Sequence, residues 1–227
     1  MNWLKYFVTF NTSKLNTKQI QLNMKIIGIG KNYVSDKSEI NALKTGAQLI
    51  FLKADTTLVT GNKDVPFPAI TNELIYEVEL VAKIGKQGKD ISVNDAASYI
   101  SEIGVGIDYT AKDVLTASRN EKGPWALAKS FDGASPVSAF KPVSQFPDLN
   151  NINFDLKING EQKQVGNTDF MIYNFSEIIA FVSQFMTLNP GDLIFTGTPA
   201  VGAGQTFKGD HLQASIEGVL LLDFKML

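Results

Sequence analysis

The stretch Ile75-Tyr76-Glu77-Val78-Glu79-Leu80-Val81 places two carboxylates inside an apolar run that is typical of a β-strand. Residues two apart on a strand share a face, so Glu77 and Glu79 are expected to point the same way, onto a face that would otherwise be core. A second apolar run, Ile103-Gly104-Val105-Gly106-Ile107, ends at a third carboxylate, Asp108. Like charges in apolar surroundings repel each other and lose solvation unless a cation compensates them.

The three carboxylates predict a site for a divalent cation. A set of carboxylate ligands favours Mg²⁺, Mn²⁺ or Ca²⁺ over zinc. The alternative is a solvated strand face on which glutamates alternate with apolar residues, a pattern that is common on its own. The residues that follow Asp108 favour the cation site.

The carboxylates belong to an ordered series of short motifs. Upstream lie Ile27-Gly28-Ile29-Gly30-Lys31-Asn32-Tyr33 and Phe51-Leu52-Lys53; downstream lie Asp108-Tyr109-Thr110-Ala111-Lys112-Asp113, Gly123-Pro124-Trp125, Ala128-Lys129-Ser130-Phe131-Asp132 and Thr196-Gly197-Thr198-Pro199. In this order and spacing the sequence resembles the fumarylacetoacetate hydrolase family over nearly everything after Met24. The resemblance is greatest to small single-domain members that act on acylpyruvates or oxaloacetate.

The resemblance implies an α+β fold, a contorted mixed β-sheet partly rolled into a barrel (a β-roll) with few helices and the metal at its mouth. It implies that Glu77, Glu79 and Asp108 are the metal ligands and that Lys129 is the active-site lysine. It further implies a metal-dependent hydrolase or lyase that cleaves a C–C bond in a 2-oxo or β-diketo acid: an acylpyruvate, a fumarylacetoacetate-like acid or oxaloacetate. Hydrolysis, decarboxylation and keto–enol isomerisation all pass through an enolate that the cation can stabilise, so the motifs do not choose among them.

The family pattern also assigns the residues expected to bind substrate. They are Lys31, Tyr33, Lys53, Lys112, Gly197 and Thr198. Two of these lysines, Lys31 and Lys112, stand where relatives carry arginine, and Leu115 stands where glutamine is frequent. Lysine cannot reproduce a bidentate arginine–carboxylate clamp. Arg119 is the only arginine among 21 basic residues, so a genome-wide lysine bias would account for both exchanges.

The predicted lid is the largest departure from the family pattern. Relatives pair a histidine with a glutamate there to orient and activate water, whereas this chain has Asp36 and Glu39, which we predict to be catalytic. Aspartate is the weaker base, because its pKa lies about two to three units below that of histidine. Three functions stay open: the C–C-cleaving enzyme, an isomerase or hydratase of a 2-hydroxy-dienoate, and a paralogue that keeps the metal but turns over little.

Composition and charge limit the kinds of partner that the chain can bind. The chain has 227 residues, of which 44% are hydrophobic, so residues 24–227 are expected to bury one core as a single catalytic domain. A net charge of −2 provides no basic footprint for nucleic acid, and no apolar run is long enough to span a membrane. The expected partners are a small 2-oxo acid and a second copy in a homodimer. Cysteine is absent, and cytoplasm is the expected location because residues 1–23 make a poor export signal.

Residues 1–23 stand apart from the family resemblance. Because the resemblance starts near Met24, we interpret them as an N-terminal extension that arises from an upstream in-frame start, a start-site artefact. An additional strand or a dimer arm is the alternative.

Hydrophobic patterning predicts mostly strands. The expected strands are residues 25–29, 48–52, 77–84, 104–107, 154–158, 193–196 and 218–224. Two helices are expected, over residues 92–100, where Ser92 and Asp95 have a loose capping-box spacing, and over about 176–186. Gly28-Ile29-Gly30 lacks the third glycine of a dinucleotide-binding fingerprint, so a nucleotide-binding fold is disfavoured. The only histidine, His211, is expected in a surface turn.

Overall fold

The computed structural model describes residues 24–227, and the predicted extension, residues 1–23, lies outside the described residues. The main sheet has six strands, in the spatial order β2 (Leu49–Lys53), β1 (Ile26–Gly30), β12 (Leu193–Phe195), β5 (Val78–Ile84), β6 (Ile100–Ile107) and β9 (Lys141–Pro142). A second sheet has four, in the order β11 (Glu161–Asn167), β10 (Asn153–Ile158), β14 (His211–Ile216) and β15 (Val219–Lys225). Within the main sheet β1 pairs with β12 in parallel and the other neighbours are antiparallel.

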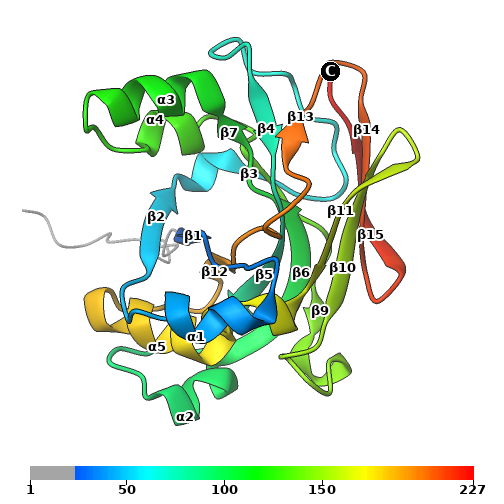
Figure 1. The fold of residues 1–227 in the computed structure, drawn as a ribbon. Coiled ribbons are helices and arrows are strands. Elements are labelled where there is room, and N and C mark those ends of the chain that lie inside the picture. The colour runs from blue at the N-terminus through cyan, green and yellow to red at the C-terminus, as the bar shows by residue number, and fades with distance from the viewer. Residues whose placement is uncertain (1–23) are drawn as a thin grey trace, which may run out of the picture.

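Short strands and helices complete the fold (Figure 1). The short strands form two small sheets, β13 (Gly204–Gln205) with β4 (Leu74–Tyr76) and β7 (Thr110–Ala111), and β3 (Leu58–Val59) with β8 (Ser135–Pro136). The α-helices are α1 (Ile40–Leu43), α2 (Val93–Ala96), α3 (Lys112–Asn120), α4 (Ala126–Lys129) and α5 (Phe175–Phe185). Single 3₁₀ turns are η1 (Lys37–Glu39), η2 (Asp55–Thr57), η3 (Ala97–Tyr99), η4 (Val143–Gln145) and η5 (Thr168–Phe170). The predicted α+β class, a mixed sheet with few helices, is confirmed.

One hydrophobic core joins the two large sheets. Leu80 and Ile103 from the six-stranded sheet and Phe154 and Phe224 from the four-stranded sheet belong to the same buried cluster. Alternate residues of β10 are buried, as a sheet with one solvated face requires. Figure 1 shows α3 and α4 at one end of the molecule and α2 with α5 at the other.

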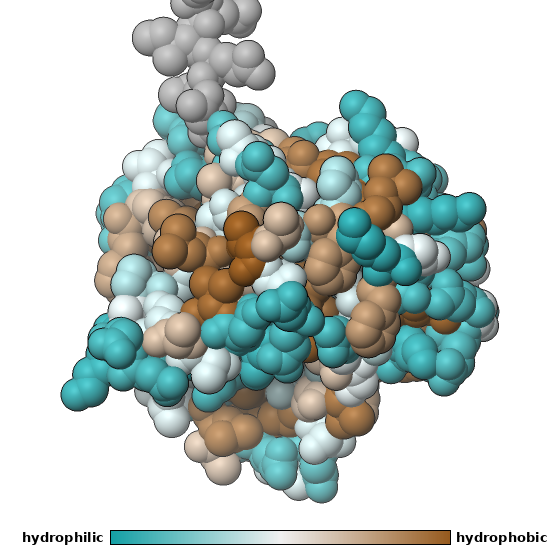
Figure 2. Space-filling model, turned by 90° about the horizontal axis from the view of Figure 1, so that it is seen from above, coloured by the Kyte–Doolittle hydropathy of each residue, from teal (hydrophilic) through white to brown (hydrophobic). Residues whose placement is uncertain are grey.

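The described surface is mixed in character. Figure 2 shows that the face seen from above combines hydrophilic and hydrophobic residues, with a group of hydrophobic ones near its centre. None of the helices in residues 24–227 is long and apolar enough to cross a membrane.

Several predicted boundaries need correction because long-range pairing overrides local pattern. The helix expected over 92–100 is only α2 followed by η3, although Ser92 does cap it by accepting a hydrogen bond from the Asp95 backbone N–H. The strand expected from Gly104 begins at Ile100, because Ile100 already pairs with Ile84 on β5.

Several elements were not predicted, among them two long strands and one helix. Strand β11 and helix α3 consist mostly of polar, charged and small residues, so neither contains a long apolar run. Strand β14 starts at His211, which the sequence placed in a turn. The His211 side chain is at the surface, as expected, and its Nε2 lies 2.5 Å from Asp223 Oδ1 on the neighbouring strand.

Helix α5 begins with a complete capping box, which leads to a stability prediction. Asn174 Oδ1 accepts a hydrogen bond from the Glu177 N–H (3.1 Å), and Glu177 Oε2 accepts one from the Asn174 N–H (3.0 Å). Asn174→Ala should lower the free energy of unfolding by about 1 kcal/mol in urea denaturation, and Asn174→Ser should retain most of it. If both variants lowered the free energy of unfolding equally, the loss would not come from the capping hydrogen bond.

Candidate active site

The pairing of β5 with β6 gathers the three carboxylates. Glu79 lies opposite Gly106 in this antiparallel register, and the Asp108 N–H donates to the Glu77 carbonyl at 2.8 Å. Glu77 occupies the single position between β4 and β5, so its side chain and that of Glu79 reach the same cavity. Sheet pairing therefore unites residues that are distant in the sequence.

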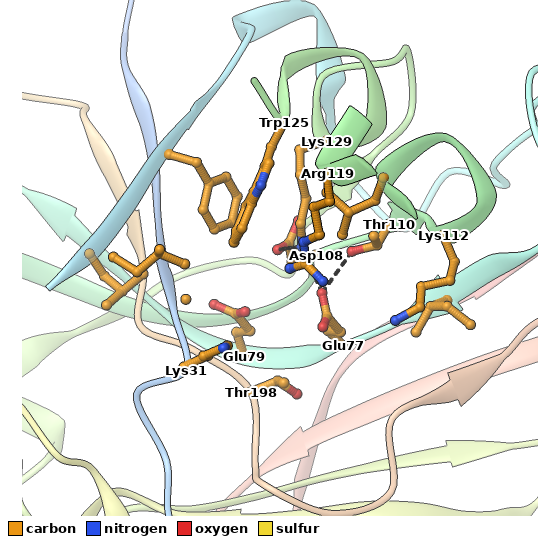
Figure 3. Close-up of a pocket in the computed structure, with 16 residues that line it drawn as sticks. Lys31, Glu77, Glu79, Asp108, Thr110, Lys112, Arg119, Trp125, Lys129 and Thr198 are labelled. Atoms are coloured by element: carbon orange, nitrogen blue, oxygen red, sulfur yellow. Dashed lines mark hydrogen bonds and ion pairs between the residues drawn. The ribbon is translucent and has the colours of Figure 1, made fainter. Parts of the chain in front are cut away.

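The cavity that receives them has a volume of about 130 Å³. Its polar lining consists of Lys31, Glu77, Glu79, Asp108, Thr110, Lys112, Arg119, Lys129 and Thr198, and its apolar lining of Ile29, Gly30, Leu49, Phe51, Ile75, Leu115 and Trp125. Figure 3 shows the carboxylates between Trp125, Lys129 and Arg119 on one side and Lys31 and Thr198 on the other.

Gly197 supports Glu79 through its backbone. Its N–H donates to Glu79 Oε2 at 2.8 Å, and its φ of +99° lies in the region that favours glycine. A Cβ there would lie 2.9 Å from the Asn32 Cβ, so any side chain would force the two segments apart. Asn32 is itself buried and donates to the Tyr173 and Thr196 carbonyls, each at 2.9 Å, which fixes the end of β1 beside β12.

Two buried lysines neutralise Asp108. Lys53 donates to one carboxylate oxygen and Lys129 to the other, and the Lys129 ammonium also donates to Glu77 Oε2 at 2.7 Å. Thr110 Oγ1 donates to the same Glu77 oxygen at 2.8 Å. Lys129 thus bridges Glu77 and Asp108. Lys53 contacts Asp108 from the core, where the Lys53 side chain is fully buried.

The charges shift the pKa values in opposite directions. Burial alone would raise the pKa of Asp108, but Lys129 and Lys53 outweigh burial and lower it. Burial alone would lower the pKa of Lys129, but Asp108 and Glu77 outweigh it and raise the pKa above its ordinary value. Burial and the nearby carboxylates of Asp108 and Glu77 raise the pKa of Glu79 well above its ordinary value. Lys129 therefore stays protonated, and Glu79 is the carboxylate whose negative charge is least compensated.

The donor set fits a hard divalent cation. Glu77 and Glu79 each keep one oxygen without a hydrogen-bond partner among the described residues. Within residues 24–227 no three acidic or histidine side chains converge as a closed ligand set, and Lys129 bridges Glu77 and Asp108. The uncompensated charge on Glu79 and the all-oxygen chemistry are what Mg²⁺ or Mn²⁺ would satisfy.

The other predicted site residues divide into two groups. Lys31, Lys112 and Thr198 line the cavity, and Thr198 Oγ1 accepts a hydrogen bond from the buried Gln164 side chain at 3.0 Å. Lys53 lies behind Asp108, away from the cavity wall, and Gly197 faces Glu79 through its N–H. Their predicted contacts with substrate would be indirect for Lys53 and by way of the backbone for Gly197.

The lid residues lie outside the cavity. Asp36 is the exposed N-cap of η1, where its Oδ1 accepts the Ser38 N–H at 2.9 Å, and this hydrogen bond lowers its pKa. Glu39 is exposed on the same turn, and Tyr33 lines a separate cavity of about 430 Å³. Catalytic roles for Asp36 and Glu39 and a substrate contact for Tyr33 stay predictions.

Two groups on the wall of the cavity were not predicted as site residues. Arg119 and Trp125 both line it, with the Arg119 Cζ 4.7 Å from the centroid of the Trp125 ring. Phe51 packs on Trp125 with ring centroids 5.8 Å apart. A helical reading of 112–120 would have revealed Arg119, because Lys112, Leu115 and Arg119 then share one face.

Residues 25–224 match the family model described as fumarylacetoacetate (FAA) hydrolase C-terminal. The chain belongs to the fumarylacetoacetate hydrolase family. It is 39% identical over 201 residues to the mitochondrial oxaloacetate tautomerase of Bos taurus. The alignment covers 88% of this chain and 90% of the relative. It is 34% identical over 196 residues to the mitochondrial oxaloacetate decarboxylase of Dictyostelium discoideum, covering 86% and 89%.

Solved structures of the family have the same fold. The fumarylpyruvate hydrolase of Pseudomonas aeruginosa, in complex with Mn²⁺ and pyruvate, is 29% identical with a TM-score of 0.79, covering 89% of this chain and 90% of that one. The 2-hydroxyhepta-2,4-diene-1,7-dioate isomerase of Mycobacterium marinum is 32% identical with a TM-score of 0.78, covering 91% and 75%. The predicted family membership is therefore confirmed, and relatives of this chain include decarboxylases, hydrolases and isomerases, one of them with a divalent metal.

Proposed function

We propose that this chain is a divalent-metal-dependent enzyme that acts on oxaloacetate or a similarly small 2-oxo acid through an enolate. The observation that carries the proposal is a single small cavity in which three carboxylates lie beside four basic side chains. The bovine and Dictyostelium relatives, both named for oxaloacetate, support this choice of substrate. The sequence predicted a 2-oxo or β-diketo acid, namely an acylpyruvate, a fumarylacetoacetate-like acid or oxaloacetate, without choosing among them.

The charge of the cavity suits an anionic substrate. Its lining has four basic and three acidic side chains, which leave about one positive charge, and a divalent cation would raise this to about three. A 2-oxo dicarboxylate carries two negative charges near neutral pH. A small enclosed site of complementary charge concentrates such an anion and orients it.

The chain's own residues have separable roles. Glu77, Glu79 and Asp108 would hold Mg²⁺ or Mn²⁺, which when bound supplies the Lewis acidity that stabilises an enolate. Lys129 places its ammonium at the centre of the cluster, where it would donate a hydrogen bond to developing oxyanion charge. Thr198 and Lys31 face the carboxylates from the opposite wall, where they would orient the substrate carboxylate (Figure 3).

The predicted C–C cleavage takes the form of decarboxylation in this proposal. Loss of CO₂ from oxaloacetate needs no activated water, whereas hydrolysis of an acylpyruvate does. Keto–enol tautomerisation is the second candidate, and one observation favours both over hydrolysis: Asp36 and Glu39, the predicted water-activating pair, lie outside the cavity. A paralogue with little turnover is the remaining alternative.

One assay separates these reactions. With Mn²⁺ present, decarboxylation releases pyruvate from oxaloacetate, whereas tautomerisation changes the enol absorbance without releasing pyruvate. We expect one of these two signals to exceed any hydrolysis of acetylpyruvate. Faster hydrolysis of acetylpyruvate would favour the hydrolase, and no turnover of either acid would favour the binding paralogue.

Metal addition should stabilise the protein. We expect millimolar Mn²⁺ or Mg²⁺ to raise the melting temperature, because a ligand at 100 times its Kd adds about 2.7 kcal/mol to the free energy of unfolding. Glu79→Gln should remove most of this rise, and the matched exposed exchange Glu73→Gln should keep it. A rise that survives Glu79→Gln, or no rise in the unaltered protein, would contradict the assigned site.

Homodimer formation and a cytoplasmic location stay predictions. The mitochondrial assignment in the names of the bovine and Dictyostelium proteins applies to those relatives.

A further inference from the structure

Helix α3 presents one face to the cavity. Lys112, Leu115 and Arg119 follow the helical spacing i, i+3 and i+7, and all three line the cavity. Leu115 is buried between the two cationic residues, so it separates Lys112 from Arg119 along the wall. Two basic groups on one wall with an apolar spacer between them can receive different anionic groups.

The Arg119 side chain lies against Trp125, which belongs to a pair of packed aromatic rings. Its guanidinium carbon lies 4.7 Å from the centroid of the Trp125 ring, and Trp125 in turn packs on Phe51. The Lys129 ammonium lies 4.8 Å from the Phe51 centroid, so the two rings connect Arg119 to the lysine at the centre of the carboxylate cluster. Arg119 also lies in the last turn of α3, where a positive charge is favourable.

Among residues 24–227, no carboxylate lies within ion-pair distance of Arg119, whereas Lys129 bridges Glu77 and Asp108. The Arg119 N–H groups therefore have no ion-pair partner among these residues and are available to a ligand in the cavity that Arg119 lines. Arginine is also unusual in this chain, which uses lysine at every other basic position. A guanidinium presents two parallel N–H groups to a carboxylate, which a lysine ammonium cannot do.

We propose that Arg119 binds the distal carboxylate of a 2-oxo dicarboxylic acid and so determines the preference of this cavity for dicarboxylic over monocarboxylic acids. The inference rests on the proposed function, since it concerns the same cavity.

Two variants test this role in turnover. Arg119→Gln should raise KM for oxaloacetate by about 10- to 100-fold, the range for a lost hydrogen bond to a charged group, with a much smaller change in kcat. Arg119→Lys keeps the charge but lacks the two parallel N–H groups of the guanidinium, so its KM for oxaloacetate should lie between those of the unaltered protein and Arg119→Gln. The values for acetylpyruvate, which has one carboxylate, should change by less than about threefold. Equal losses on both acids would show that Arg119 has only a structural role.

Binding of unreactive acids gives a readout that does not depend on turnover. Malate and 2-hydroxybutanoate differ only in a terminal carboxylate against a methyl group, and calorimetry with Mn²⁺ present should show tighter binding of malate. Arg119→Gln should abolish this preference. The matched control Lys122→Gln, an exposed charge loss near α3 that does not line the cavity, should keep it.

The outcomes for the two proposals are distinguishable. If malate is preferred through Arg119 but oxaloacetate is not turned over, the proposed function fails and the role of Arg119 stands. If oxaloacetate is turned over while malate and 2-hydroxybutanoate bind equally, or while Arg119→Gln leaves the preference intact, the role of Arg119 is overturned and the proposed function stands.

Discussion

Asp108→Asn should lower the free energy of unfolding by about 3–5 kcal/mol, the loss expected when one partner of a buried ion pair is removed. Asp108 is 1% exposed and accepts hydrogen bonds from two lysines, Lys53 and Lys129. Asparagine is nearly the same size, so the effect reports charge rather than volume. Lys53, whose side chain is fully buried, would be left without its carboxylate.

Urea denaturation without added metal measures this effect. Glu73→Gln, an exposed exchange of the same kind, should change the free energy of unfolding by less than about 0.5 kcal/mol. Adding Lys53→Met to Asp108→Asn should recover part of the loss, because the unpaired buried ammonium is removed as well. A loss below about 1 kcal/mol for Asp108→Asn would contradict the view that Asp108 anchors both lysines.

Lys129→Met should lower kcat on oxaloacetate by about 10²–10³-fold, the typical effect of removing one donor to an oxyanion. The Lys129 ammonium is the only basic group lining the cavity that contacts the carboxylates of the described residues directly. Because the same ammonium competes with a cation for Glu77 and Asp108, the variant should bind Mn²⁺ at least as tightly as the unaltered protein.

Steady-state kinetics and a Mn²⁺ titration of the melting temperature give the two readouts together. Circular dichroism at the assay temperature verifies that the variant is folded. Loss of kcat with Mn²⁺ binding retained identifies Lys129 as a catalytic residue. Loss of Mn²⁺ binding in a folded variant would instead show that Lys129 organises the ligands, and an unchanged kcat would exclude it from the reaction.

The mixed sheet was predictable where the sequence has a strong period. Strands β1, β5 and β10 lie within a residue or two of their expected positions, because runs of Val, Ile and Leu bounded by turn residues have few other structures. The polar strand β11 and the amphipathic helix α3 were not predicted, because their conformations depend on the segments they pack against rather than on local propensity.

By itself the sequence determined the family and the α+β class, because these depend on residue types in a fixed order. Only the tertiary structure decided which charges meet. The β5–β6 register brings Asp108 to Glu77, the core holds Lys53 behind Asp108, and α3 turns Arg119 toward the cavity while leaving Asp36 outside it. These outcomes depend on distances between residues far apart in the chain, and the energies of charge pairs depend on such distances and on burial, which a sequence does not contain.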